Sequence, residues 1–228
     1  MKTVLITGGS GGIGAAAARA AAAKGWRVFV GYNKGRERAE TISREINGEA
    51  VHVALEDEAS ILAAVSFVKT KTVTLDAAVL CASLPPPLLP YLKTGEAALL
   101  EQFSVSAGHQ RLVAELWKAF FAKAKGGHVV GVSSQAARTP PWPGFTSYVV
   151  AKRALEAALE CAKVELGKDG LRVSVIRPGY TETPMLLALN PHVLDAIRAK
   201  AGPEGLLKPE AVGDQILALL DGPIQEKP

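Results

Sequence analysis

Short apolar runs alternate with longer segments of mixed polarity along the chain, from residue 2 to about residue 220. The apolar runs have the length of buried strands, and the longer segments repeat apolar positions at helical spacing. This alternation is typical of βαβ units built around a parallel sheet. The pattern predicts six strands, at residues 2–7, 27–32, 50–55, 74–81, 127–133 and 171–177.

The predicted helices lie between these strands, and glycines stand near several of their ends. Gly25, Gly48 and Gly167 are such stop signals, because glycine readily adopts the left-handed conformation that closes a last helical turn. The chain shows no internal repeat and no flexible linker, so we expect one α/β domain over residues 1–228, with a doubly wound parallel sheet flanked by helices. The helices are predicted at 12–24, 36–47, 59–69, 96–125 and 147–167.

Composition and charge narrow the classes of protein. Hydrophobic residues make up 48% of the 228 and charged residues 21%, which excludes disordered and collagen-like chains. The net charge is +4, but basic and acidic residues alternate without a basic block, so nucleic-acid binding is not predicted. Cys81 and Cys161 form no disulfide framework, and no residue cluster predicts a metal site. No apolar stretch has the length of a signal-peptide core or a membrane span, so we expect a cytoplasmic protein.

The first predicted strand leads into a glycine-rich turn, Gly-Gly-Ser-Gly-Gly-Ile-Gly at residues 8–14, and then into an alanine-rich helix. Glycines allow a tight turn and a close approach of the backbone to a pyrophosphate, which the positive end of the helix dipole attracts. A purely structural turn is the alternative, but the strand–turn–helix context favours a dinucleotide site. The residues expected to contact the cofactor here are Thr7, Gly8, Ser10, Gly12, Ile13 and Gly14.

The end of the second predicted strand bears on the choice of cofactor. NAD-preferring sites usually place a carboxylate there to bind the ribose 2′-hydroxyl, but residues 33–36 read Asn-Lys-Gly-Arg. Lys34 and Arg36 have the charge to neutralise a 2′-phosphate, and Asn33 lies beside them. The sequence therefore favours NADP over NAD, against the alternative of two solvated charges at a helix start.

Tyr148 and Lys152 lie one turn apart on a predicted helix, so both project from one face. An unperturbed phenol has a pKa near 10, and a nearby ammonium favours its ionised form. The spacing therefore suits a coupled acid and cation, although it also occurs by chance on exposed helices. Ser133, the last residue of the fifth predicted strand, and Ser134 directly after it precede this pair.

Residues 7–14, Ser134, Tyr148, Lys152 and the Pro-Gly pair at 178–179 together resemble the short-chain dehydrogenase/reductase family, over residues 2–221. The resemblance implies a Rossmann-like fold with Tyr148 as the general acid, Ser134 orienting the carbonyl oxygen, and Lys152 binding the nicotinamide ribose and lowering the tyrosine pKa. Positioned donors of this kind stabilise the charge that hydride transfer leaves on oxygen. Ser133 competes for the serine role, and the 14-residue separation of Ser134 from Tyr148 is closer to the family's spacing.

The resemblance also assigns residues around the nicotinamide and the substrate. Thr183 binds the carboxamide, and the backbone of Pro178, Gly179 and Thr181 orients the ring; a turn followed by a helix cap at Thr183 is the alternative. Residues 185–202 fall where the family carries a substrate-covering lid, here with an apolar inner face. Ala82 is what is left of an asparagine-containing motif at residues 80–83.

Other positions depart from the family pattern. Ala54 replaces the aspartate that contacts adenine, with Glu56 or Asp57 as possible substitutes, and Ser106 stands where many members have an asparagine that holds a relay water. The usual final strand is expected to be missing after the helix at 209–220. We expect a homo-oligomer, with a dimer through the helices at 96–125 and 147–167 favoured.

The leading interpretation is an NADP-dependent oxidoreductase that reversibly reduces a small-molecule aldehyde or ketone. A nucleotide-binding regulator that has kept the fold is the non-enzymatic alternative, because of the changes at 80–83, Ala54 and Ser106. A 3-oxoacyl-carrier-protein reductase is a narrower alternative. The identity of the substrate does not follow from the sequence.

Overall fold

Six parallel strands pair in one sheet, in the order β3-β2-β1-β4-β5-β6, in the computed structural model, which describes residues 1–138, 142–201 and 205–222. The predicted six-stranded parallel sheet is confirmed. The order runs outward in both directions from β1, so the sheet is doubly wound. The strands are β1 (Thr3–Thr7), β2 (Arg27–Tyr32), β3 (Glu49–His52), β4 (Ala77–Leu80), β5 (Gly127–Val132) and β6 (Leu171–Ile176).

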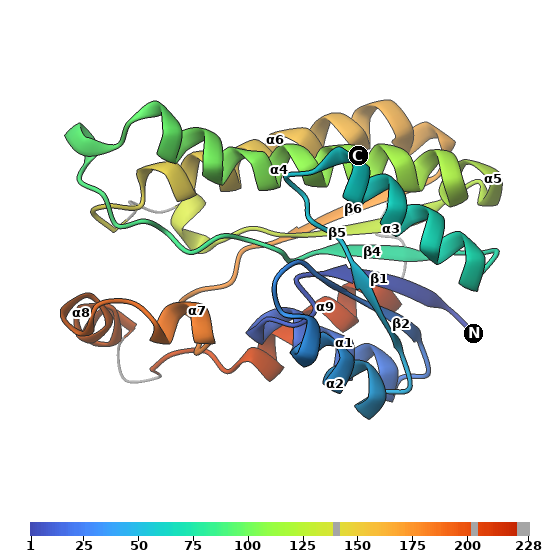
Figure 1. Cartoon of the computed structure of the whole chain (residues 1–228), viewed down its shortest axis with the longest axis horizontal. Helices are drawn as coiled ribbons and strands as arrows, with labels where there is room; N and C mark the ends of the chain where they lie inside the picture. Colours follow the sequence, from blue (N-terminus) through green and yellow to red (C-terminus); the bar gives the residue numbers. More distant parts are fainter. Residues whose placement is uncertain (139–141, 202–204, 223–228) are drawn as a thin grey trace.

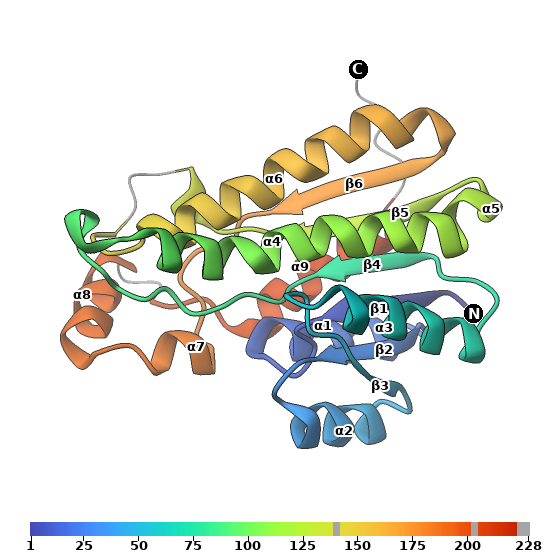
Figure 2. The same ribbon diagram turned by 45° about the horizontal axis from the view of Figure 1, so that its top comes forward.

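Helices cover both faces of the sheet (Figure 1). One face carries α1 (Gly12–Ala23), α2 (Arg36–Glu45) and α9 (Pro209–Asp221), and α1 packs directly on α9. The other face carries α3 (Glu58–Lys71), α4 (Glu96–Leu116) and α6 (Thr146–Leu166), and Figure 2 shows α4 and α6 side by side. Each face has its own hydrophobic core. The flanked doubly wound architecture is therefore as predicted.

The central strands are apolar on both faces because helices bury both sides of a parallel sheet. Every residue of β1 is buried. Val4 and Ile6 belong to the core under α1 and α9, while Leu5 between them belongs to the core under α3, α4 and α6. This alternation is the period of two that a strand imposes on its side chains.

Some boundaries differ from the prediction. The third strand ends earlier than predicted, and the fourth begins later and ends earlier. Apolar residues beyond the end of the third strand, such as Val53 and Leu55, are buried although they do not belong to a strand, so burial alone predicted too long a strand. The helix predicted at 96–125 is interrupted after α4 by a π-helical turn at Trp117–Phe121, followed by α5 (Ala122–Ala124). Phe121 packs there against Gly127, where a Cβ would lie 2.4 Å from its ring. Short 3₁₀ turns occur at Tyr91–Lys93, Gln135–Ala137 and Gly167–Asp169.

Two further helices, α7 (Pro184–Leu187) and α8 (Pro191–Ala201), lie beyond the carboxyl ends of the strands (Figure 1). They fall in the segment predicted to cover the substrate. Three parts of the chain considered in the sequence analysis lie outside the described residues. They are Pro140 and Pro141, residue 202 at the end of the expected lid, and the tail at 223–228, where the final strand was expected to be missing. Among the helices that the structure describes, none combines the length and apolar character needed to cross a membrane.

Candidate active site

The glycine-rich turn brings the backbone of β1 and α1 close together. Gly8 has a φ of +63°, in the left-handed region that glycine favours. A Cβ on Gly14 would lie 2.2 Å from the Gly8 carbonyl oxygen, so α1 can leave the strand this closely only without a side chain at that position. No side chain caps the start of α1 at Gly11, and the first N–H groups of a helix have no partner within it. These groups and the helix dipole suit a pyrophosphate.

A cavity of about 530 Å³ opens beside this turn, at the carboxyl ends of the strands, and we call it the cofactor cavity. Its volume lies within the range of small-molecule and cofactor sites. The glycine turn, the open helix start and nearby cations fit a nicotinamide dinucleotide. The predicted residues that line it are Gly8, Ser10, Gly12, Ile13, Gly14, Asn33, Lys34, Ala82, Tyr148, Lys152 and Thr183.

Arg36 does not line the cofactor cavity, in contrast to the prediction. Its Nε lies 2.7 Å from Glu40 Oε1 on the exposed side of α2. Arg38 lines the cavity instead, with Lys34. Residues two apart on a helix point about 200° from each other, so the two arginines face opposite ways. Gly35 lies close to the turn, because a Cβ there would lie 2.7 Å from Ser10 Oγ and 3.2 Å from Arg38 Nη2.

The two acidic candidates near Ala54 have different surroundings. Glu56 lines the cofactor cavity and accepts a hydrogen bond from Asn33 Nδ2 at 2.6 Å. Asp57 instead caps α3, where its Oδ1 accepts from the Ala59 N–H at 2.9 Å. Of the two possible substitutes, only Glu56 therefore has a side chain at the cavity.

Thr7 supports the cavity wall without lining the cavity itself. Its side chain is buried, and Oγ1 accepts hydrogen bonds from the N–H groups of Cys81 at 3.0 Å and Ala82 at 3.2 Å. This fixes the end of β1 against the loop that follows β4. The serine of that altered loop, Ser83, lines the cofactor cavity, as Tyr148 does.

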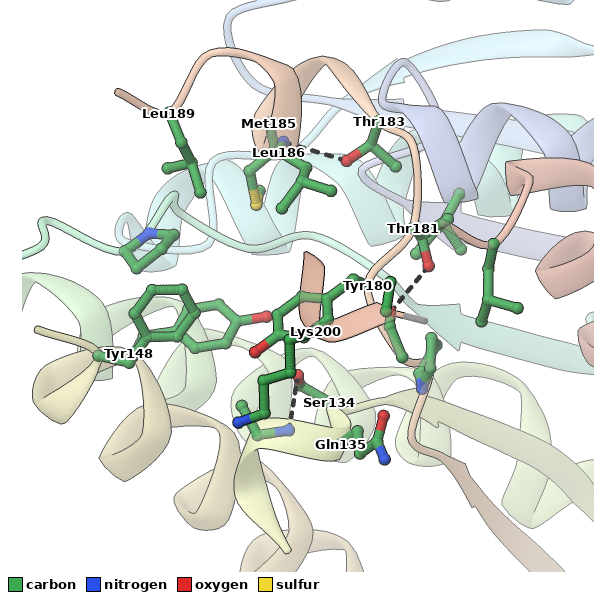
Figure 3. A pocket seen from close by; sticks show the side chains of 18 of the residues that line it. Ser134, Gln135, Tyr148, Tyr180, Thr181, Thr183, Met185, Leu186, Leu189 and Lys200 are labelled. Carbon is green, nitrogen blue, oxygen red and sulfur yellow. Dashed lines mark hydrogen bonds between the residues drawn. The ribbon is translucent and has the colours of Figure 1, made fainter. Parts of the chain in front are cut away.

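A second cavity, of about 620 Å³, lies between the ends of β5 and β6 and the helices α7 and α8, and we call it the substrate cavity (Figure 3). Pro178, Gly179 and Thr181 line this cavity and not the cofactor cavity. Thr183 lines both and also caps α7, accepting from the Leu186 N–H at 3.3 Å, so the alternative capping role is also present. The apolar wall of the substrate cavity includes Phe145, Met185, Leu186 and Leu189.

Tyr148 lies where the two cavities meet and lines both. Ser134 lines the substrate cavity together with Tyr148. Lys152, one turn along α6, is buried and lines the cofactor cavity; its Nζ donates to the Val132 carbonyl at 2.9 Å and lies 5.7 Å from the centroid of the Tyr148 ring. The three predicted catalytic residues are thus brought together.

Burial has the largest effect on the pKa values of Tyr148 and Lys152. It raises the pKa of Tyr148, and the side-chain hydroxyls of Ser134 and Ser83 oppose the rise only in part. Burial lowers the pKa of Lys152 to about 8. The protein by itself therefore does not lower the tyrosine pKa as the resemblance implied, since the desolvation of the phenolate outweighs the other effects. Tyr148 keeps its proton at neutral pH, which is the form that a general acid needs.

Ser133 and Ser134 are distinguished by a buried carboxylate that the sequence analysis did not single out. Ser133 Oγ donates to Glu156 Oε1 at 2.5 Å, and Arg177 donates two hydrogen bonds of 2.9 Å to the same carboxylate. Although burial raises the pKa of Glu156, the bonds from Arg177 and Ser133 hold it below its ordinary value. The Ser133 hydroxyl is therefore engaged, while Ser134 faces the substrate cavity beside Tyr148.

Ser106, the expected counterpart of a relay asparagine, is also engaged. Its Oγ donates to the Ala151 carbonyl at 2.7 Å and is buried between α4 and α6. Together with His109, it borders a cavity of only about 10 Å³ behind Tyr148 and Lys152. The hydroxyl therefore ties the two helices together at the level of the candidate catalytic residues.

Comparisons with known proteins agree with this geometry. Glycine betaine reductase ATRR of Emericella nidulans is 28% identical over 97% of this chain, which spans 18% of that protein's length. Cis-4-hydroxycyclohexanecarboxylate dehydrogenase of Sinomonas cyclohexanicum is 28% identical over 96% of this chain and 88% of its own length. The crystal structure of 3-ketoacyl-(acyl-carrier-protein) reductase from Brucella melitensis, complexed with NADH, matches the fold with a TM-score of 0.88 at 23% identity, over 97% of this chain and 91% of that one.

The family model described as short chain dehydrogenase matches residues 2–193, most of the chain. The match includes the glycine-rich turn, the end of β5 and the Tyr148–Lys152 pair on α6. The chain therefore belongs to the short-chain dehydrogenase family of NAD(P)-binding oxidoreductases.

Proposed function

We propose that this chain reversibly reduces an aldehyde or ketone to an alcohol with NADPH, with Tyr148 as the general acid. The observation that carries the proposal is the position of Tyr148, which lines both the cofactor cavity and the substrate cavity. A group at that junction can contact the reacting atom of a substrate in the substrate cavity, next to a nicotinamide in the cofactor cavity. Proton transfer requires such direct contact or one intervening water.

The cofactor cavity offers a place for each part of the dinucleotide. The glycine-rich turn and the start of α1 would hold the pyrophosphate, and Lys34 and Arg38, which line the cavity, would hold the 2′-phosphate of the adenosine ribose. Lys152 would bind the nicotinamide ribose, and Thr183 would bind the carboxamide. When bound, NADPH supplies the hydride that the protein itself cannot provide.

The protein's own contribution is to hold the carbonyl and deliver the proton. Ser134 donates a hydrogen bond to the carbonyl oxygen, and Tyr148 gives its proton to that oxygen as negative charge develops. Because burial keeps Tyr148 protonated, the acid is present before reduction begins. Glu156 holds Ser133 and Arg177, so it fixes the end of β5 that carries Ser134 relative to α6.

The helices α7 and α8 cover the substrate cavity as a lid, with Leu186 and Leu189 facing inward. Assembly as a dimer would use α4 and α6, the neighbouring helices on one face. Both carry exposed apolar side chains, with Leu100 and Phe103 on α4 and Val150 on α6. Apolar groups on adjacent helices are typical of a surface that another chain covers.

Tyr148→Phe tests the proposal. It removes one oxygen and should lower kcat for carbonyl reduction by 10²-fold or more, while the Kd for NADPH, measured by fluorescence titration, changes little. Tyr180→Phe is the matched control, because Tyr180 lines the substrate cavity but not the cofactor cavity, and its effect on kcat should be far smaller. Equal losses in the two variants would contradict the role of Tyr148. NADPH binding without reduction of any carbonyl by the wild type would instead favour a nucleotide-binding regulator.

A further inference from the structure

The wall of the substrate cavity carries one charged side chain among the residues that the structure describes, and it is a cation. This is Lys200, near the end of α8. No aspartate or glutamate is among the described residues that line the cavity. Figure 3 shows the Lys200 side chain in the cavity, in the same region as Ser134, Tyr148 and Tyr180.

Lys200 differs from nearby basic residues in its partner. Arg198, two residues earlier on α8, pairs with Asp195 at 3.3 Å, and Lys208 pairs with Glu182. Within the described part of the chain, Lys200 has no carboxylate within ion-pair distance, and its ammonium lies 5.6 Å from the centroid of the Trp142 ring. An aromatic face attracts a cation without neutralising its charge.

Among the described residues, Lys200 has no carboxylate partner at a largely apolar cavity, and this arrangement favours an anionic ligand. The other described residues that line the cavity are apolar or neutral, so the Lys200 ammonium is the one full charge among them. In a cavity of this kind, a small number of polar groups fixes the orientation of the ligand. A lysine ammonium is a compact point charge that pairs well with a carboxylate. One cation balances one negative charge, which favours a monoanionic carboxylate over a phosphate dianion.

We infer that the substrate carries a carboxylate, which Lys200 binds at the lid while the carbonyl group reaches Tyr148 and Ser134. This inference rests on the proposed function, because it names the substrate class of that same site. The lid helix α8 thereby recognises the substrate and covers it. The substrate is thus an oxo acid or a formyl acid whose acidic end lies toward α8.

The test uses two probes that share the formyl group and the aromatic ring and differ in charge, para-formylbenzoate and its methyl ester. The Kd of each is measured by calorimetry on the full chain saturated with oxidised cofactor, so that no turnover is needed. We expect the carboxylate to bind at least about fivefold more tightly than the ester, and this ratio to shrink as salt is added. Failure of the carboxylate to bind more tightly than the ester would overturn the inference.

Lys200→Met keeps an unbranched apolar side chain and removes the charge near Trp142, so the two Kd values should converge. Lys200→Arg should preserve the preference. Arg198→Met is the matched control, because it removes the same charge from the same helix at a residue that does not line the cavity, and it should retain the wild-type ratio. A ratio that falls equally in Lys200→Met and Arg198→Met would assign the preference to general charge and overturn the role of Lys200.

A parallel turnover assay separates this inference from the proposed function. Reduction of both probes with equal kcat/KM and equal Kd would leave the reductase intact and refute the carboxylate site. A Lys200-dependent preference in binding, with neither probe reduced, would support the carboxylate site and count against carbonyl reduction. The two proposals therefore fail on different measurements.

Discussion

Two buried histidines should make the fold sensitive to mild acid. His109 is fully buried, and His128 is 3% exposed. Burial lowers the pKa of His109 to about 3 and that of His128 to about 4, with smaller contributions from Lys152 and Arg172. Both therefore fold in the neutral form, although an unfolded histidine has a pKa near 6.5.

The hydrogen bond between His109 Nε2 and Thr7 Oγ1 favours the neutral form of the histidine. Thr7 Oγ1 accepts from the N–H groups of Cys81 and Ala82, which occupy both of its lone pairs. Its hydroxyl hydrogen is left for an acceptor, and His109 Nε2 at 2.9 Å is closer than the Val79 carbonyl at 3.3 Å. Protonation at Nε2 would destroy this bond inside the protein.

The sign of the pH effect follows from proton uptake. The folded pKa values lie below the unfolded value, so the unfolded chain binds protons first as pH falls. The stability contributed by each histidine is complete above pH 6.5 and is lost as pH falls toward the folded pKa. At 1.36 kcal/mol per pKa unit, lowering the pH to 5 costs about 2 kcal/mol for each histidine and about 4 kcal/mol in total. Small domains have only about 5–15 kcal/mol of stability.

Urea unfolding followed by circular dichroism, from pH 7.5 to pH 5, measures this loss as a fall in the free energy of unfolding. His128 Nε2 lies 3.0 Å from Ser174 Oγ. Glutamine keeps a polar partner for Thr7 or for Ser174 but does not titrate, so His109→Gln and His128→Gln should each remove about half of the fall. His192→Gln, at an exposed position on α8, should leave it unchanged. A double variant that retains the full fall would refute the reasoning, whatever its stability at pH 7.5.

Three further predictions concern the cofactor cavity and its supports. Replacing Lys34 and Arg38 together with alanine should weaken NADPH binding at least tenfold and NADH binding much less, whereas Arg36→Ala should change neither; equal losses for the two cofactors would contradict the 2′-phosphate assignment. Gly14→Ala should abolish dinucleotide binding in a titration, because its Cβ would meet a carbonyl oxygen at 2.2 Å, and wild-type affinity would exclude this close packing. Glu156→Gln should lower the free energy of unfolding by about 3 kcal/mol in urea, because it leaves a partly buried arginine without its counter-charge; a loss within 0.5 kcal/mol, the usual range for surface changes, would show that the network is dispensable.

Local patterns in the sequence were sufficient for the fold and for part of the site. Apolar runs such as the one in β1 indicate a strand that is buried on both faces. Such burial follows wherever helices cover both sides of a sheet. The glycine-rich turn is local as well, because φ at Gly8 and the close approach at Gly14 arise within a few residues. The relation of Tyr148 to Lys152 follows from helix geometry alone. These features depend on short-range sterics and periodicity, which neighbouring residues determine.

The tertiary structure decided which polar groups meet. Arg38 lines the cofactor cavity and Arg36 does not, because the orientation of α2 against the sheet selects one face of that helix. Glu156 engages the Ser133 hydroxyl, although 23 residues separate them in sequence. Lys200 lies in the substrate cavity only because α8 folds over the ends of the strands. Side-chain chemistry and spacing say what each group can bind, but long-range packing determines its distance from a partner, and electrostatics and hydrogen bonding depend on that distance.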